Sequence, residues 1–394
     1  MRKIMLAAAV AATVLHGPAR SHDLSVQPAE APAAQPLPIA PNVEGSLPTP
    51  EDGYFQVPEQ VTEGVWLLRQ PRFQVQPIGN VAVIEQADGL VLVDSGGSPG
   101  AGRRIVDMVR EISPKPVKAV VITHWHGDHP QGLSAILEAW PNARTIATVQ
   151  TQTHLVTPAT MNTPGAPDPA RNAAFQQQIQ GFVGYIRQMG ANARTDYGRA
   201  NWAAGERLMN QYALDMDGAL TLPVQEGVAD RLVIDDAERP VEVLYLGRAN
   251  TDGDAVIWLP RQRIVAAGDI VVHPFPYGFG SYPGEWIETF GRLKALGFET
   301  LIPGHGPVLQ GTAYVDQVIA ALEDVRAQVT PLAEAGVPLD QIMSRTDFSA
   351  QRTGFVGEDP WQTRWFNDFW LQPIVTAAYR EARGEPIIQS LNPG

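Results

Sequence analysis

The chain has 394 residues, of which 44% are hydrophobic, and this is enough to bury a large core. Its 42 acidic residues outnumber its 29 basic ones, and the formal net charge of −13 excludes the basic surface that a nucleic-acid-binding protein needs. We therefore expect a small-molecule substrate and no nucleic acid as a partner.

The N-terminal residues 1–21 have the layout of a secretory signal peptide. Two basic residues precede an apolar run at 4–15, and small residues follow up to Ser21. A run of about a dozen residues is too short to span a bilayer, and no other stretch approaches the ~20 that are needed. We expect a periplasmic or secreted protein without a stable membrane span. Residues 22–55 are rich in proline and alanine and predict an extended linker, or a strap packed on the surface.

Residues 56–310 alternate strand and helix signals. Short apolar runs predict strands at 65–69, 80–85 and 90–93, and a helix follows over 101–112 and ends before Pro114. Residues 118–123 predict another strand, and 133–139 a second helix. The strand pattern returns at 241–246, 255–259 and 263–267. This alternation favours an α/β layered fold.

A run rich in metal-binding side chains follows the predicted strand that ends at 123. Residues 123–129 read Thr-His-Trp-His-Gly-Asp-His, which places three imidazoles and a carboxylate within six positions. Zinc and similar divalent metals bind such donors. A purely structural zinc site prefers cysteine thiolates, and cysteine is absent from the chain. The run therefore indicates an open, hydrolytic metal site.

The spacing within this run predicts where its side chains point. Side chains two apart on an extended chain fall on one side, so His124 and His126 can reach the same ion. Gly127 lets the backbone turn. The turn would aim Asp128 and His129 at a second ion or at the far side of the first.

The run at 123–129 resembles the signature loop of the metallo-β-lactamase superfamily, and further landmarks follow in order. Residues 92–96 resemble the early Asp-Ser/Thr-Gly turn, 267–269 resemble the Gly-Asp that supplies a bridging carboxylate, and 303–306 resemble the late Gly-His ligand segment. The resemblance spans about 65–308. It implies a four-layer αββα sandwich and the metal ligands His124, His126, Asp128, His129, Asp269 and His305.

One landmark departs from the family. Residues 246–254 lie where the family usually has Gly-x-x-His-Thr-x-Gly, and this chain has Asn250 in place of the histidine. An amide oxygen is a weak neutral donor beside imidazole. We therefore expect weaker binding of the ion held by His124 and His126, with Asn250 as a weak ligand or as support behind the ligands.

Three outcomes are open for the metal centre: two metals, a single metal held by Asp128, His129 and His305, or an inactive remnant. Asp269 favours two metals, because a carboxylate there is well placed to bridge ions. Otherwise it would lie buried beside a second acidic group, and each carboxyl would raise the pKa of the other.

Hydrolysis is the expected reaction. A metal lowers the pKa of a bound water towards ~7, and Asp128 would orient the resulting metal-bound hydroxide. The expected substrate is a small-molecule ester, lactone, thioester or lactam, and the expected cofactor is one or two zinc ions, with iron or manganese not excluded. The alternatives are an iron-dependent oxidoreductase or oxygenase on the same fold, and a non-catalytic metal-binding protein.

A loop at 273–282, rich in glycine and aromatic residues, follows Asp269 closely. If Asp269 lies at the metal, the loop borders the pocket, and Tyr277 or Tyr282 could hydrogen-bond a substrate oxygen. The alternative is a surface loop stiffened by proline. His273 is the candidate to replace the imidazole that is missing at position 250.

Two further segments predict helices. Residues 151–222 exceed what the sandwich requires, and apolar spacing predicts one helix around 175–189 and another over 202–212. This insertion would cap the sandwich, and it could also roof the metal site. Residues 311–394 predict a helical C-terminal extension, with one helix stopped by Pro331 and an aromatic helix over 361–370 that packs on the body or mediates dimerisation.

Overall fold

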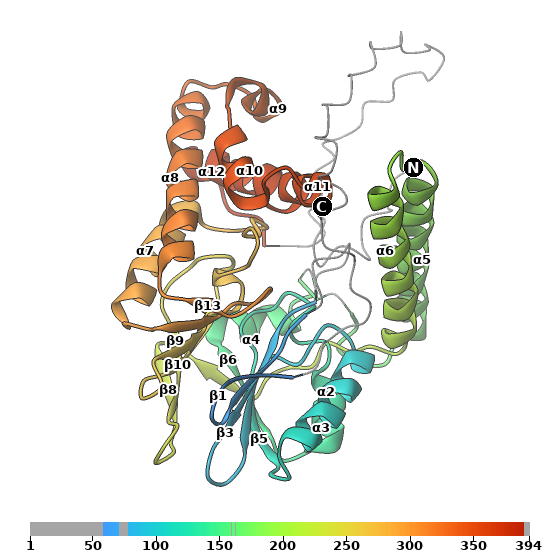
Figure 1. The fold of residues 1–394 in the computed structure, drawn as a ribbon, viewed down its shortest axis with the longest axis vertical. Helices are drawn as coiled ribbons and strands as arrows, with labels where there is room; N and C mark the ends of the chain where they lie inside the picture. The colour runs from blue at the N-terminus through green and yellow to red at the C-terminus, as the bar shows by residue number, and fades with distance from the viewer. Residues whose placement is uncertain (1–57, 71–77, 159, 162, 390–394) are drawn as a thin grey trace.

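The computed structural model describes residues 58–70, 78–158, 160–161 and 163–389 (Figure 1). The expected signal peptide and linker lie outside these residues. Within them, no helix is both long and apolar enough to cross a membrane. The described chain contains a seven-stranded sheet, ordered β1 to β7, and a six-stranded sheet, ordered β13-β12-β11-β10-β9-β8.

The first sheet consists of β1 (Glu59–Thr62), β2 (Val65–Leu68), β3 (Val81–Glu85), β4 (Leu90–Val93), β5 (Val117–Val121), β6 (Arg144–Thr148) and β7 (Glu226–Val228). The second consists of β8 (Arg231–Ile234), β9 (Val241–Tyr245), β10 (Ala255–Leu259), β11 (Ile264–Ala266), β12 (Thr300–Ile302) and β13 (Leu309–Gln310). All the strands expected from the sequence are present, and the short edge strands are additional.

Alternating apolar side chains hold the layers together. Val91 and Val93 of β4 point into the core between the two sheets, whereas Leu90 and Leu92 pack against α2 (Pro99–Ile112) and α3 (Leu133–Ala139). Strand β10 behaves in the same way, with Ile257 between the sheets and its neighbours against helices on the other side. Strand side chains alternate between faces, so a strand covered on both sides is apolar throughout.

The second sheet is covered by α7 (Pro283–Ala295), α8 (Ala313–Glu334) and α12 (Gln372–Ala382). Figure 1 shows α7 and α8 on one side of the sheets and α2 and α3 on the other. The αββα sandwich implied by the resemblance is therefore confirmed.

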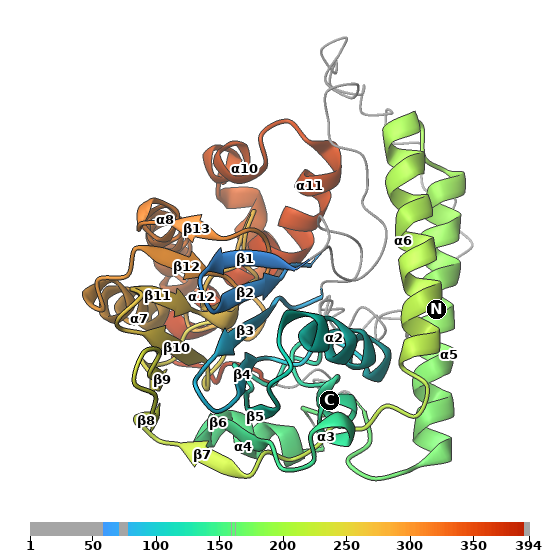
Figure 2. The same cartoon turned by 60° about the horizontal axis from the view of Figure 1, so that its bottom comes forward.

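The insertion consists of α4 (Val149–Val156), α5 (Pro169–Ala191) and α6 (Asp196–Asp215). Helices α5 and α6 form a long antiparallel hairpin beside the sandwich (Figures 1 and 2). Asp168 caps α5, since its side chain accepts hydrogen bonds from the Ala170 and Arg171 amides. The hairpin contacts the C-terminal extension through the rings of Trp202 and Trp361, whose centroids lie 4.9 Å apart.

One expectation for the C-terminal extension is wrong. Pro331 does not stop its helix, because α8 continues to Glu334 and the Pro331 carbonyl still accepts a hydrogen bond from the Ala335 amide. The aromatic segment is helical and buried, as expected, but it is not one regular α-helix. It runs from α11 (Pro360–Trp365) through a π-helical turn, η3 (Phe366–Leu371), into α12. The smaller elements are η1 (Gly268–Ile270), α9 (Leu339–Ile342), η2 (Met343–Arg345) and α10 (Ser349–Val356).

We expect Trp370 to anchor the C-terminal extension. Its side chain is fully buried, its ring centroid lies 6.2 Å from that of Trp286, and its indole N–H donates to Gln351. Trp370→Ala should lower the free energy of unfolding by about 3–5 kcal/mol in urea titrations, because it leaves a large cavity. The control Leu214→Ala, at a side chain that is 72% exposed, should change it by less than about 0.5 kcal/mol. Equal stability of the two variants would contradict this packing.

Candidate metal centre

The candidate ligands lie on loops at one edge of both sheets. Strands β4 and β5 are parallel, with Val93 opposite Val121, so the residues that follow them meet at the same edge. Strands β11 and β12 are also parallel, with Ala266 opposite Ile302, and they bring Asp269 close to His305. The fold therefore gathers polar residues from four strand ends.

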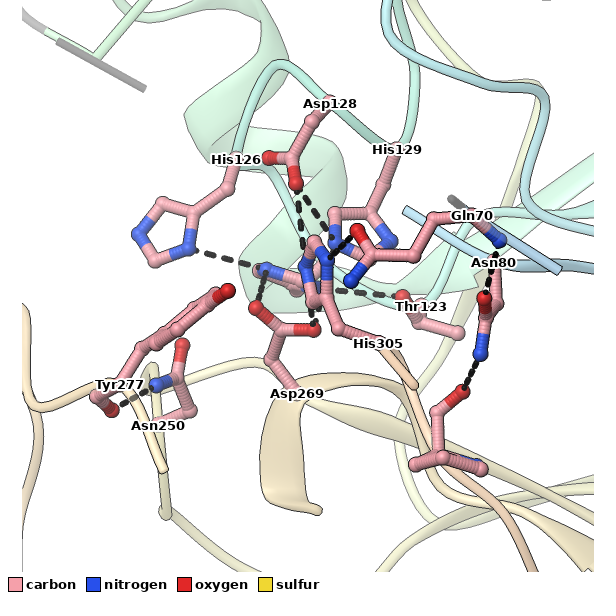
Figure 3. A network of polar contacts seen from close by, with 12 residues as sticks. Gln70, Asn80, Thr123, His126, Asp128, His129, Asn250, Asp269, Tyr277 and His305 are labelled. Atoms are coloured by element: carbon pink, nitrogen blue, oxygen red, sulfur yellow. Dashed lines mark hydrogen bonds and ion pairs between the residues drawn. The ribbon is translucent and has the colours of Figure 1, made fainter. Parts of the chain in front are cut away.

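Imidazole nitrogens and carboxylate oxygens converge here (Figure 3). His305 Nε2 lies 3.1 Å from Asp128 Oδ2 and 3.3 Å from Asp269 Oδ1. His129 Nε2 lies 3.5 Å and 3.3 Å from the same two oxygens. His124 Nε2 lies 3.7 Å from Asp269 Oδ2. Two groups can each hold an ion, one formed by Asp128, His129 and His305 and the other by His124, His129 and Asp269.

The spacing of the His-x-His-x-Asp-His run predicts that its first pair, His124 and His126, and its second pair, Asp128 and His129, point to different places. In the structure the two pairs lie closer together than this. The rings of His124 and His129 lie with centroids 4.2 Å apart, and His129 belongs to both groups of ligand atoms. His126 belongs to neither group, although its Nδ1 lies 2.9 Å from His124 Nε2. The turn after His126 brings His129 back beside His124.

The burial of these atoms tests whether a metal fits. His129 Nε2, His305 Nε2 and Asp269 Oδ1 are buried without a hydrogen-bond partner among the described residues. Both nitrogens lie 3.3 Å from Asp269 Oδ1 without hydrogen-bond geometry, and buried polar atoms nearly always have a partner, so a proton or a cation is needed between them. A divalent cation coordinated by them would satisfy all three. The donor set therefore fits a metal.

The pKa values of the imidazoles differ across the site. Burial alone would lower the pKa of His305, but the charges of Asp269 and Asp128 outweigh it and raise the pKa to about 9. For His129, burial is likewise outweighed by Asp128 and other carboxylates, and its pKa is raised. Burial lowers the pKa of His126 to about 4. In the absence of metal, protons on two imidazoles thus compensate the carboxylates, and a cation can take over this role.

Asp94 orients His129. Its Oδ2 lies 2.8 Å from His129 Nδ1, which leaves Nε2 facing the other ligands. The same carboxylate accepts hydrogen bonds from the Thr123 amide at 2.7 Å and the Thr123 hydroxyl at 2.9 Å. It therefore also fixes the first residue of the run. The sequence pointed to Asp94 only through its place in the early Asp-Ser-Gly turn.

Gln70 and Asn80 hold the late ligand. Gln70 Oε1 lies 2.8 Å from His305 Nδ1, and the backbone N–H of Gln70 donates a hydrogen bond to Asn80 Oδ1. The Asn80 side chain donates to the carbonyls of Pro303 and Gly306 on either side of His305. Sequence reasoning missed both residues. Single amide side chains carry no motif, and these two become neighbours only through the pairing of β2 with β3.

Asn250 lies beside the ligands in a defined orientation. It is fully buried, and its Nδ2 donates to the Tyr277 carbonyl at 2.6 Å, so its Oδ1 is the atom left without a partner (Figure 3). Asn250 therefore holds the 273–282 loop while it keeps one oxygen available. This geometry is compatible with both expected roles, as a weak ligand and as support.

The three expected substrate-binding residues lie in different places. Tyr277 is buried at the centre, with its ring centroid 5.0 Å from that of His305. Tyr282 instead packs against the Arg248 guanidinium at 4.4 Å. The His273 ring packs against Tyr314, with ring centroids 5.2 Å apart, and it belongs to neither group of ligand atoms, so its role in place of the imidazole missing at position 250 stays a prediction.

Gly304 is required for the approach of Asp269. A Cβ at Gly304 would overlap Asp269 Oδ1 and would lie 2.9 Å from the Asp269 amide nitrogen. Gly304→Ala should displace the carboxylate and weaken metal binding at least about 10-fold, measured as zinc retained after dialysis.

Gly291→Ala is the matched control. It lies inside α7, where a Cβ meets nothing within 4 Å. It should retain the wild-type zinc content and raise the free energy of unfolding by about 0.5–1 kcal/mol, because alanine favours helix. Wild-type zinc retention in Gly304→Ala would contradict the role of Asp269.

Comparison with known proteins identifies the family of this chain. The family model of the metallo-beta-lactamase superfamily matches residues 76–305, more than half of the chain. A linear primary-alkylsulfatase from Pseudomonas sp. (strain ATCC 19151) is 23% identical over 294 residues, which cover 69% of this chain and 51% of that protein. A metallo-beta-lactamase type 2 from Bacillus cereus is 23% identical over 275 residues, covering 68% and 82%. The chain thus spans about half the length of the alkylsulfatase.

Solved structures of a metallo-beta-lactamase and of an alkylsulfatase are similar to the structure of this chain. The DIM-1 metallo-beta-lactamase is 18% identical with a TM-score of 0.46, and the match covers 69% of this chain and 99% of that one. The inverting sec-alkylsulfatase Pisa1 from Pseudomonas sp. is 17% identical with a TM-score of 0.48, covering 84% and 50%.

Proposed function

Since this chain belongs to the metallo-β-lactamase superfamily, we propose that it is a zinc-dependent hydrolase of a small-molecule ester, lactone, thioester or lactam. One observation carries the proposal: buried imidazole and carboxylate atoms from several loops converge, and three of them have no hydrogen-bond partner in the described chain. The alkylsulfatase and β-lactamase relatives support a metal-dependent hydrolase.

The donor atoms divide unequally between two ions. One imidazole nitrogen binds one ion, so His129 cannot serve both groups at once. If it joins Asp128 and His305, the second ion is left with His124 and its neighbours, namely His126, Asp269 and the Oδ1 of Asn250. We propose a tight site at the first group and a weaker site at the second, because an amide oxygen is a weaker donor than imidazole.

The chain's own residues have separate tasks in hydrolysis. A bound zinc ion supplies a Lewis acid that polarises the scissile bond and acidifies water. Asp128 contacts both neighbouring imidazoles through Oδ2, so its Oδ1 is the atom that we propose accepts a hydrogen bond from the attacking water and orients it. Asp94 and Gln70 hold the rings of His129 and His305 in place.

Metal analysis of Asn250→His tests the unequal sites. The wild type should retain one zinc tightly and a second weakly. Asn250→His should raise occupancy of the weak site without abolishing turnover, because it restores an imidazole donor. Asn250→Leu loses the same hydrogen bond to Tyr277 without gaining a donor, so it should not raise zinc content. A stoichiometry of one in both the wild type and Asn250→His would contradict the two-metal centre.

A hydrolysis panel tests the reaction. It should contain an ester, a lactone, a thioester and a lactam, with an alkyl sulfate added because of the alkylsulfatase relative. We expect turnover of at least one carboxylic acid derivative, and a decrease of about 100-fold or more in His305→Ala, which removes a ligand. Full zinc occupancy without any turnover would favour a non-catalytic protein. Iron in coloured protein would favour an oxidoreductase.

A further inference from the structure

Tyr212, on the last turns of α6, has a buried hydroxyl that the fold leaves unsatisfied. Its side chain is 2% exposed, and the hydroxyl has no hydrogen-bond partner among the described residues. Leaving a buried hydroxyl unpaired costs about 1–3 kcal/mol. Phenylalanine would fill the same space without this cost, so packing does not explain the hydroxyl.

The end of α6 packs on the start of α2, and the segment that leads into α2 contacts the metal centre. A Cβ at Gly100, in the first turn of α2, would lie 2.6 Å from Asp215 Cβ, so α6 packs directly on this glycine. Asp215 also forms an ion pair with Arg104 of α2. Three residues before Gly100, a Cβ at Gly97 would lie 3.1 Å from Asp128 Cα. The short segment 97–100 therefore contacts Asp128 at one end and the end of α6 at the other.

The rest of the insertion is anchored at the same place. Gln131, two residues after His129, donates to the Thr221 hydroxyl at 3.0 Å and accepts a hydrogen bond from the Thr163 hydroxyl at 2.9 Å. All three side chains are buried. Thr163 precedes α5 and Thr221 follows α6, so both ends of the helical hairpin are fixed to the metal-binding loop.

The electrostatics of Tyr212 agree with this position. Burial is the larger cause and the charge of Asp128 the smaller one, and together they raise the pKa of Tyr212 well above its ordinary range. The phenol therefore remains a neutral hydrogen-bond donor at physiological pH. A neutral phenol can donate a hydrogen bond either to an uncharged carbonyl oxygen or to a carboxylate oxygen.

We propose that the helical insertion contributes Tyr212 to the metal centre as a substrate-binding residue whose hydroxyl donates a hydrogen bond to a carbonyl or carboxylate oxygen of the bound ligand. The identity of that ligand rests on the proposed hydrolase function. The insertion thereby takes part in substrate selection, since ligands without an acceptor oxygen at this point leave the phenol unpaired.

Tyr212→Phe tests this assignment because it removes only the hydroxyl. The zinc-loaded variant should keep the wild-type zinc content and unfold at least as late in urea as the wild type, since an unpaired group is removed. Its Kd for butyrate, a simple carboxylate, should rise about 10-fold in calorimetry, and kcat/KM on the active panel substrate should fall about 10-fold. Tyr185→Phe is the matched control. Its hydroxyl, on the same insertion, accepts a hydrogen bond from Arg364, and both constants should stay at wild-type values.

The outcomes separate this assignment from the proposed function. An unchanged Kd and kcat/KM in Tyr212→Phe, a loss of zinc, or the same effect in Tyr185→Phe would overturn the role of Tyr212. If the wild type hydrolyses nothing but Tyr212→Phe still weakens butyrate binding, the hydrolase proposal fails and the role of Tyr212 stands. A wild type that neither binds butyrate nor turns over any panel compound overturns both.

Discussion

The compensation of buried negative charge is the constraint on which this structure depends. Asp128 and Asp269 are almost completely buried, and their carboxylates lie within 3.1–3.5 Å of the nitrogens of His129 and His305. A carboxylate in the interior must be neutralised by a proton or by a cation. The raised pKa values of His129 and His305 favour protonated imidazoles beside these carboxylates, and a divalent cation bound at the same nitrogens would take over their charge.

The surrounding residues make this arrangement possible by fixing ring orientations and leaving space. Asp94 and Gln70 each hold the outer nitrogen of one imidazole, so that the inner nitrogen faces the carboxylates. Gly304 leaves room for Asp269, where even a methyl group would overlap the carboxylate. These residues come from loops far apart in the chain; Asn80, for example, binds the carbonyl of Gly306 across 226 residues. The centre therefore requires the whole sandwich to be folded.

The helical insertion and the C-terminal extension contact each other, and the insertion also contacts the edge of the sandwich that carries the candidate metal ligands. The Tyr197 hydroxyl of α6 donates to Asp359 before α11, and the rings of Trp202 and Trp361 pack edge to face. The insertion also contacts α2 through Asp215. Movement of the α5–α6 hairpin would consequently displace residues of the C-terminal extension and residues beside Asp128. This coupling is consistent with a role of the insertion in substrate binding.

The sequence alone determined the features that depend on local pattern. Alternating apolar residues predicted the central strands, and the ordered landmarks up to His305 predicted the αββα sandwich and the residues that gather at its edge. The substitution at Asn250 was also visible, because the motif defines what belongs at that position. Helix α5 and part of α6 followed from apolar spacing.

Only the tertiary structure decided how these residues act, because the deciding contacts join distant parts of the chain. It placed His129 in both groups of candidate ligand atoms, turned the side-chain amide of Asn250 towards the Tyr277 carbonyl, and packed the His273 ring against Tyr314. Helix α8 also continues past Pro331, where local propensity predicts a stop. Gln70 and Tyr212 belong to no motif, and their environments exist only after strand pairing and helix docking bring them to the metal centre.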